Sequence, residues 1–244
     1  MKIYNLPVAV EGNFAQLRQK HLFWKAMHSL LFEELRKKDS DYARYVHETK
    51  VKPFSFKVTE DNVLNIFGFE ERFNGYLKQL FLEPVIGRVR EESFTVKRVL
   101  HATTGGEISL LELLGEEGGN IKFNTLTPLS FKIGDIYLPL PVPQYIFQNL
   151  FNRWNALFSV KIPEGFLDEA NKRVYLKKSK VETVSRTGLK GYYGFVGVFE
   201  LGIERLAVNE QRYAIALAKF GHFAGIGVKT SMGFGMVNVN IKKS

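Results

Sequence analysis

Glycines, a lysine and two hydroxyl residues gather near the C-terminal end of the 244-residue sequence, in a segment whose composition suits phosphate. Glycine lets the backbone approach another surface and present amide donors to phosphate oxygens. Lys229 adds positive charge, and Thr230 and Ser231 add short donors. The spacing is not that of a P-loop, and the strand expected next excludes a dinucleotide-binding turn. A phosphate site and a purely structural turn both stay open. The glycines are Gly225, Gly227, Gly233 and Gly235.

A second group suited to phosphate chemistry lies in the first half of the chain, where His47 precedes Lys50 and Lys52. An imidazole titrates near neutral pH and can act as an acid or a base. An ammonium ion is a compact cation that suits phosphate oxygens. From the residue types alone, a histidine at a helix end with no catalytic role is the competing interpretation.

The elements that must position these residues follow a similar order in the two halves of the chain. The first half reads as strand, helix, strand, strand, helix, strand, the order of a ferredoxin-like fold. We expect these elements at 2–10, 17–38, 53–59, 63–69, 70–83 and 94–102. After a flexible join or hairpin at 105–120, we expect elements at 121–126, 136–140, 144–158, 181–187, 191–203, 210–223 and 235–241. The sequence therefore predicts an α+β protein with two tandem ferredoxin-like domains, 1–120 and 121–244, and a C-terminal glycine-rich loop.

The net positive charge of the chain is confined to its second half. Residues 1–120 carry 17 Lys and Arg against 17 Asp and Glu, whereas residues 121–244 carry 17 against 8 and account for the whole net charge of +9. Such a basic half is expected to attract a polyanion, since Lys and Arg displace counterions from phosphates. A merely basic protein without such a ligand is the alternative. The densest basic stretch runs from Lys172 to Lys190.

Composition excludes several other classes of protein. The 45% hydrophobic content indicates a globular chain with a core, and the lack of Cys excludes disulfides and thiolate metal sites. Paired-histidine metal motifs are also missing, so we expect neither a metal nor a cofactor. No apolar run approaches the roughly 18 residues of a membrane helix, and the N-terminal residues do not form a secretory signal. A cytoplasmic protein without a membrane partner is the expectation.

Segments spread over nearly the whole chain resemble one known family. The segment FGHFAGIGVKTSMGFGMVNV at 220–239 is similar to the glycine-rich signature of the CRISPR-associated endoribonucleases that process crRNA, within the repeat-associated mysterious protein superfamily. FNTLTPLSFKIGDIYLPLP at 123–141 and VETVSRTGLKGYYGFVGVFEL at 181–201 resemble two of the family's hairpin segments. DYARYVHETKVKPFSF at 41–56 resembles the stretch that carries the family's catalytic histidine.

The resemblance implies a metal-independent endoribonuclease that cleaves CRISPR repeat RNA, the pre-crRNA. A ribose 2′-hydroxyl would attack the adjacent phosphate and leave a 2′,3′-cyclic end. By resemblance, His47 at the end of the first predicted helix is the general acid or base, with Lys52 or Lys50 as electrostatic stabiliser. Some relatives carry a Tyr facing this histidine, where counting back reaches Phe32. His28, one turn before Phe32, is the candidate for the missing role.

The same resemblance predicts that RNA lies along the basic second half and the glycine-rich loop. Repeat RNA and crRNA are the expected partners, with effector-complex subunits and a homodimer through the Phe-rich first helix left open. The alternative function is a non-catalytic repeat-RNA-binding subunit of a CRISPR interference complex, which Phe32 favours, and an unrelated basic binding module is a further one. Beyond the loop residues named above, the predicted RNA contacts are Lys178, Lys180, Arg186, Lys190 and Tyr192.

Overall fold

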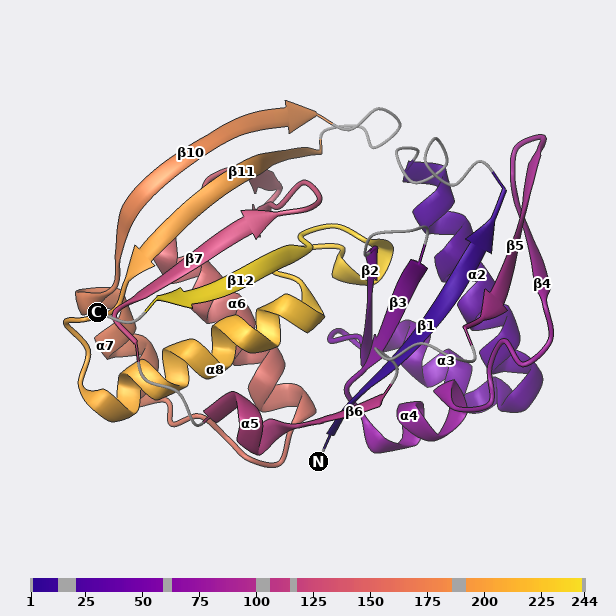
Figure 1. Ribbon diagram of the computed structural model, residues 1–244, viewed down its shortest axis with the longest axis horizontal. Coiled ribbons are helices and arrows are strands. Elements are labelled where there is room, and N and C mark those ends of the chain that lie inside the picture. The colour runs from indigo at the N-terminus through magenta and orange to yellow at the C-terminus, as the bar shows by residue number, and fades with distance from the viewer. Residues whose placement is uncertain are drawn as a thin grey trace.

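Two antiparallel sheets form the framework of the protein (Figure 1). The computed structural model describes residues 2–12, 21–58, 63–99, 106–114, 118–185 and 192–242. The first sheet has the strand order β2-β3-β1-β5-β4, with β6 also paired to β1, and the second has the order β10-β11-β7-β12. In each half the first strand lies between the third and the last strand of a βαββαβ unit. This is the ferredoxin-like order that the sequence predicts.

The bounds of the elements are as follows. The strands of the first half are β1 (Lys2–Glu11), β2 (Phe54–Val58), β3 (Val63–Gly68), β4 (Val85–Val89), β5 (Glu92–Arg98) and β6 (Gly106–Ser109). Its helices are α2 (His21–Lys38), α3 (Ser40–Glu48), α4 (Glu71–Leu77) and α5 (Leu110–Leu114). The strands of the second half are β7 (Asn120–Thr125), β8 (Phe131–Ile133), β9 (Ile136–Leu138), β10 (Tyr175–Ser185), β11 (Tyr193–Gly202) and β12 (Val237–Lys242). Its helices are α6 (Pro143–Leu157), α7 (Gly165–Arg173), α8 (Val208–Ala224) and the short 3₁₀ helix η1 (Thr230–Met232).

The helical segment before β2 differs from the expectation in a way that matters for His47. The sequence predicts one helix to about Lys38 with His47 at its end, but His47 lies on a separate helix, α3. Asp39 separates the two helices because its extended backbone leaves α2 and its carboxylate accepts a hydrogen bond from the Tyr42 N–H at 2.9 Å. Such a side-chain cap starts a new helix. The predicted start at residue 17 lies outside the described residues.

One helix is shorter than the sequence predicts, and several other elements are not predicted from the sequence at all. Helix α4 ends at Leu77 instead of residue 83, because its last turn gives way to irregular turns before Pro84. The supposed flexible join contains β6, which pairs with the Lys2–Asn5 end of β1, and helix α5. The sequence also gave no signal for β4, β8 or α7.

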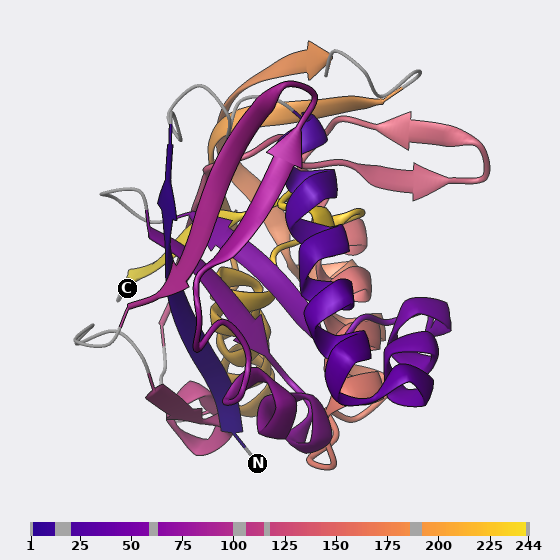
Figure 2. The same ribbon diagram turned by 90° about the vertical axis from the view of Figure 1, so that its right-hand side faces the viewer.

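Helix α2 covers one face of the first sheet, with α3 beside its end (Figure 2). The aromatic residues Phe23 and Phe32 of α2 are buried in the core of the first half. This burial is a correction to the idea that the Phe-rich helix offers a dimer surface. Among the described residues, no helix is long and apolar enough to cross a membrane.

The opposite face of the first sheet packs against the C-terminal end of α8. The Phe67 and Phe223 rings lie 5.3 Å apart, and those of Phe69 and Phe220 lie 5.4 Å apart. Strand β2 adds polar contacts, because Ser55 donates to the carbonyl of Phe223 at 2.5 Å.

The Lys57 ammonium on the same strand reaches the last turn of α8. It lies 3.1 Å from the carbonyl oxygens of His222 and Val237 and 3.0 Å from a ring nitrogen of His222. Burial lowers the pKa of Lys57 to about 7. Burial and the charge of Lys57 together lower the pKa of His222 to about 4.

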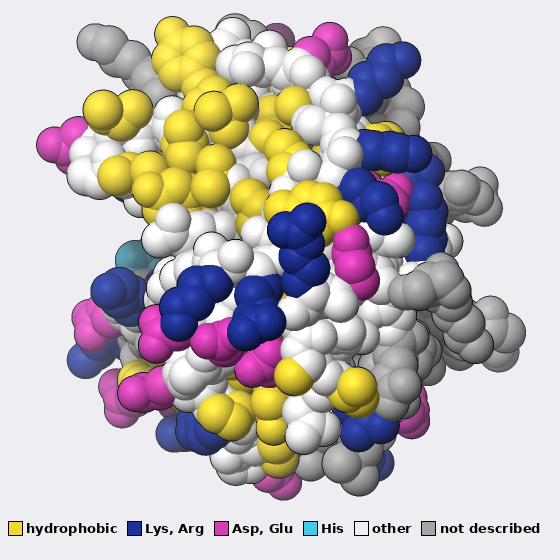
Figure 3. Space-filling view, turned by 90° about the vertical axis from the view of Figure 1, so that its left-hand side faces the viewer, with side chains coloured by type: hydrophobic (Ala, Val, Ile, Leu, Met, Phe, Trp, Pro, Cys, Tyr) yellow, Lys and Arg dark blue, Asp and Glu magenta, His cyan; other side chains and the backbone are white. Residues whose placement is uncertain are grey.

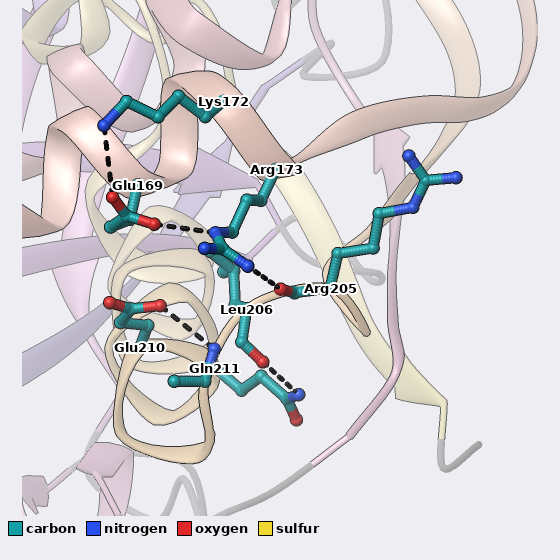
Figure 4. A network of polar contacts seen from close by, with 8 residues as sticks. Glu169, Lys172, Arg173, Arg205, Leu206, Glu210 and Gln211 are labelled. Atoms are coloured by element: carbon teal, nitrogen blue, oxygen red, sulfur yellow. Dashed lines mark hydrogen bonds and ion pairs between the residues drawn. The ribbon is translucent and has the colours of Figure 1, made fainter.

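Part of the basic stretch that follows Lys172 is neutralised by neighbouring acids. Glu169 on α7 accepts from Lys172 at 3.2 Å and from Arg173 at 2.6 Å, and Arg173 also donates to the Arg205 carbonyl (Figure 4). On the face of the molecule shown in Figure 3, several Lys and Arg side chains likewise lie next to Asp or Glu. Lys172 and Arg173 are thus held by Glu169, whose charge the net value of +9 already includes.

Replacing Lys57 with Met should raise the pKa of His222 from about 4, because one of the two causes of its lowering is removed. The pKa should stay below 6.5, since burial is the larger cause and remains. Titration of the His222 ring by NMR measures this, with Lys132→Met on the β8–β9 hairpin as control. Because His222 binds its proton more weakly when folded, the unfolding free energy of the wild type should rise with pH between about 4 and 6.5. An unchanged His222 titration in the variant would contradict the contact.

Candidate functional site

His28 on α2 makes a hydrogen bond to the glycine-rich loop of the other half. Its Nδ1 lies 3.1 Å from the carbonyl oxygen of Ser231 in η1. Since a carbonyl oxygen only accepts, Nδ1 carries the proton, and in the neutral ring Nε2 is left as an acceptor. Burial lowers the pKa of His28, and the charges of Lys52 and His47 lower it further against the raising effect of the Ser231 bond. His28 is therefore held as a neutral base at neutral pH.

The phenyl ring of Phe32 lies between the two histidines that the sequence singled out. Its centroid is 4.8 Å from that of His28 and 5.4 Å from that of His47, with the His47 contact edge to face. The two predictions that Phe32 faces His47 and that His28 shares the face of Phe32 are both met by this geometry. His47 itself is exposed near the end of α3. Two imidazoles, one half-buried and one exposed, thus meet around one apolar ring.

Lys52 holds the end of α3 rather than pointing freely outward. Its ammonium donates to the carbonyl oxygens of Val46 at 3.1 Å, His47 at 2.5 Å and Thr49 at 2.7 Å. The last carbonyls of a helix lack intrahelical partners and favour a nearby cation. Lys52 therefore fixes the segment that carries His47, whereas Lys50 is exposed.

The amides of the glycine-rich loop are used within the protein, which corrects the prediction that the glycines present them to RNA. The N–H groups of Gly225, Gly227, Gly233 and Gly235 donate to Gly221 O, Asn149 Oδ1, Thr230 O and Pro128 O. A Cβ at Gly233 would lie 2.3 Å from the Trp24 ring, so the loop needs glycine there to pack on α2. Close packing explains these glycines without a ligand.

The hydroxyl residues of the loop are also placed differently from the expectation. The sequence predicts Thr230 and Ser231 as hydroxyl donors to RNA. Both residues are buried, so their side chains do not offer such donors at the surface. Ser231 acts instead through its backbone carbonyl, which accepts from His28. Lys229 is only half-buried, with a left-handed backbone (φ 61°) that turns the chain into η1. Of the three predicted loop donors, only Lys229 keeps access to solvent.

The other predicted RNA contacts divide into three groups. Tyr192, predicted as an RNA contact, is buried, donates to the Pro128 carbonyl at 3.1 Å and packs on Phe234, so its ring is not open to a base. Lys178 and Lys180 are exposed on the edge strand β10, away from α2 and α3 (Figure 1). Arg186 and Lys190 lie outside the described residues.

Residues that the sequence patterns missed hold the start of the loop. Asn149 and Arg153 lie one turn apart on α6, between apolar residues of the same helix that are buried. Arg153 donates to the carbonyls of Gly225 and Ala224, and Asn149 pairs with both backbone groups of Gly227. The sequence feature that could have pointed to Arg153 is an arginine next to Trp154 within an otherwise apolar helix face. Within the described ranges, no group of three or more His, Asp or Glu side chains could hold a metal ion.

Comparisons with known proteins bear on this arrangement. The sequence profile of the family described as CRISPR-associated endoribonuclease Cas6 matches residues 123–237. A protein of that description from Streptococcus thermophilus is 25% identical over 233 residues, which cover 88% of this chain and 90% of that protein. A solved Cas6 product complex superposes with a TM-score of 0.81 at 22% identity and covers 98% of this chain and 100% of its own. A Cas6 substrate-mimic complex gives 0.75 at 22% identity with the same coverage.

The fold is that of the tandem ferredoxin-like proteins, and the fold class predicted from the sequence is confirmed. The family model and the curated relative support a CRISPR-associated endoribonuclease, in agreement with the resemblance found in the sequence.

Two glycines with similar positive φ angles should respond differently to alanine. At Gly134 (φ 56°) a Cβ meets nothing within 4 Å, whereas at Gly235 (φ 65°) it would lie 1.9 Å from the Ile226 carbonyl oxygen. Gly134→Ala should cost only the backbone strain, about 1 kcal/mol. Gly235→Ala should cost about 3 kcal/mol or more, because the overlap adds to that strain. Denaturant unfolding of both variants measures the difference, and equal losses would contradict the packing described for the loop.

Proposed function

We propose that this protein cleaves CRISPR repeat RNA within pre-crRNA, using His28 and His47 without a metal ion. One observation carries the assignment of the site: both imidazoles lie against Phe32, and the Ser231 carbonyl fixes the proton of His28 on Nδ1. A base and an acid near one another are what transfer of a phosphate between ribose oxygens requires. The Cas6 relatives are endoribonucleases by description, which supports the reaction class.

The reaction then takes one proton from the nucleophile and gives one to the leaving group. His28 Nε2 accepts the 2′-hydroxyl proton as the 2′-oxygen forms a bond to phosphorus. The bond between phosphorus and the 5′-oxygen breaks as His47 donates a proton to that oxygen. The products are a 2′,3′-cyclic phosphate and a 5′-hydroxyl, and exchange with water restores both rings. The exposed Lys50 is the lysine best placed to reach a phosphate oxygen, because the ammonium of Lys52 serves the end of α3.

RNA on either side of the cut needs a basic path to this site. We assign Lys229, at the surface of the loop, and the exposed Lys178 and Lys180 of β10 to that path. Lysines spread along a surface bind phosphates without regard to base sequence, so affinity should fall steeply with salt. Arg186 and Lys190, predicted for the same path, continue the chain from β10. The division into domains 1–120 and 121–244 fits this separation of a catalytic half from a basic half.

Phe32 stands where a hydrogen-bonding tyrosine would otherwise face His47. Neither nearby tyrosine replaces it: Tyr42 is buried with its hydroxyl 3.2 Å from Glu70, and Tyr45 stacks on Tyr42. His28 takes the role instead, from one turn earlier on the same helix. The product crRNA would stay bound through the basic path and pass to subunits of a CRISPR effector complex.

The decisive test is cleavage of labelled repeat RNA in EDTA by the wild type and by His47→Ala. A parallel substrate carries a 2′-deoxyribose at the cut. The wild type should cut, and the variant should lose more than about 100-fold in rate because the leaving oxygen has no proton donor. The deoxy substrate should bind and remain intact. A second variant, Tyr45→Ala on the same helix, is the control and should cut normally.

Other outcomes of that assay would contradict the proposal in different ways. Tight binding by the wild type without any cleavage would favour the non-catalytic RNA-binding subunit. Cleavage that EDTA abolishes and Mg²⁺ restores would contradict the metal-independent step. Full activity of His47→Ala would remove His47 from the reaction.

The pH dependence of cleavage tests His28 as the base. A base works only when unprotonated, and burial lowers the pKa of His28 below 6.5. As pH falls, the decline of kcat/KM should therefore have its midpoint below 6.5. Rates measured under single-turnover conditions from acid to neutral pH give the midpoint of this limb. A midpoint at or above 6.5 would contradict the assignment of His28.

A further inference from the structure

Two side chains of α6 clamp the start of the glycine-rich loop. Arg153 Nη1 donates to Gly225 O at 2.8 Å, and its Nη2 donates to Ala224 O at 2.9 Å. Asn149 accepts from the Gly227 N–H at 2.9 Å and donates to the Gly227 carbonyl at 3.3 Å. Residues four apart on a helix share one face, so the two side chains grip consecutive parts of one segment.

Arg153 is a buried charged residue, and its burial needs a specific structural reason. Only 8% of the residue is exposed, and burial lowers the pKa of Arg153 to about 10, so it stays charged at neutral pH. Removing such a charge from water is costly, and an apolar residue of similar size would pack there without that cost. What an apolar residue cannot do is satisfy two neighbouring carbonyls at the end of α8, which a planar guanidinium matches in shape and charge.

The clamped segment leads directly to the contact with His28. Beyond Gly227, the Val228 N–H donates to Ser130 O at 3.0 Å, and the chain then turns into η1. There the Ser231 carbonyl accepts from His28 Nδ1, and Gly233 packs against Trp24 of α2. The loop is thus held at one end by α6 and meets the catalytic helix at the other.

We propose that Asn149 and Arg153 are positioning residues for RNA cleavage, which act through the loop on the tautomer of His28. With the loop in place, the Ser231 carbonyl holds the proton on Nδ1 and leaves Nε2 free to take a proton from RNA. With the loop displaced, His28 exchanges between tautomers and spends part of its time with Nε2 protonated. The effect on catalysis rests on the function proposed above, whereas the effect on the tautomer does not.

Asn149→Ala tests the clamp, with Asn152→Ala as the matched control. Asn152 is an exposed amide one turn closer to the C-terminal end of the same helix, and it bonds only to Gln148 among the described residues. Nitrogen-15 NMR of the His28 ring reports the tautomer in protein without RNA. Asn149→Ala should move His28 from the Nδ1–H form to a mixture. It should lower the single-turnover rate about tenfold while the Kd for RNA changes less than about twofold, since misplacement of a reacting group affects the chemical step. Asn152→Ala should change neither.

A second variant covers the case in which Asn149→Ala does not fold. Asn149→Asp keeps an acceptor for the Gly227 N–H but turns an acceptor toward the Gly227 carbonyl. It should retain the fold, and the repulsion between these two oxygens should still displace the loop and shift the tautomer.

The readouts separate the two proposals. A His28 that keeps the Nδ1–H form in both Asn149 variants would overturn the clamp. A tautomer shift without any change in the cleavage rate would overturn its role in the reaction. A wild type that never cuts RNA, together with the expected tautomer shift, would refute the proposed function and leave the control of His28 by α6 standing.

Discussion

The carbonyl groups at the C-terminal end of α8 are the constraint on which the arrangement of the protein depends. The last turn of any helix leaves carbonyls without intrahelical partners, and here that end lies inside the molecule, between the two halves. Partners come from both halves: Lys57 and Ser55 from β2, and Arg153 from α6. Positive charge at the negative end of a helix is favourable, and losing Lys57 or Arg153 would leave buried acceptors unsatisfied. One helix end therefore ties the first sheet to the second domain.

Because this helix end runs directly into the glycine-rich loop, the same contacts determine where the loop lies. Its glycines serve close packing and its amides are bonded within the protein, so the loop is part of the packed scaffold. The loop meets the ring of His28 through one carbonyl group, that of Ser231. A backbone carbonyl is a suitable choice, because it cannot donate and therefore accepts only one of the two neutral tautomers. The contacts that join the two halves therefore also determine which nitrogen of His28 carries the proton.

The order of the elements was predictable from the sequence, because apolar periodicity reports which face of each strand or helix is buried. Contacts between distant parts of the chain produce no periodic pattern in the sequence and could not be predicted in this way. Lys57 alternates with Phe54 and Phe56 as a solvent-facing residue would, yet the second domain covers that face of β2. Arg153 interrupts an apolar helix face, and only the carbonyls of α8 explain it. Tyr192 was predicted to contact RNA because basic residues lie near it in the sequence. That proximity does not determine which way its ring points, and the ring is buried.

The contact between Phe32 and His28 places an apolar ring at the site that we propose transfers protons. A tyrosine at position 32 would offer a hydroxyl to His47, whereas the phenyl ring excludes water from the side of His28 that it covers. Burial is the main reason that the pKa of His28 is lowered, so the ring favours the neutral imidazole that a base needs. His47, on the other side of the ring, is exposed to solvent. In the reaction proposed above, this difference in burial between two histidines around one phenyl ring is what would separate the base from the acid.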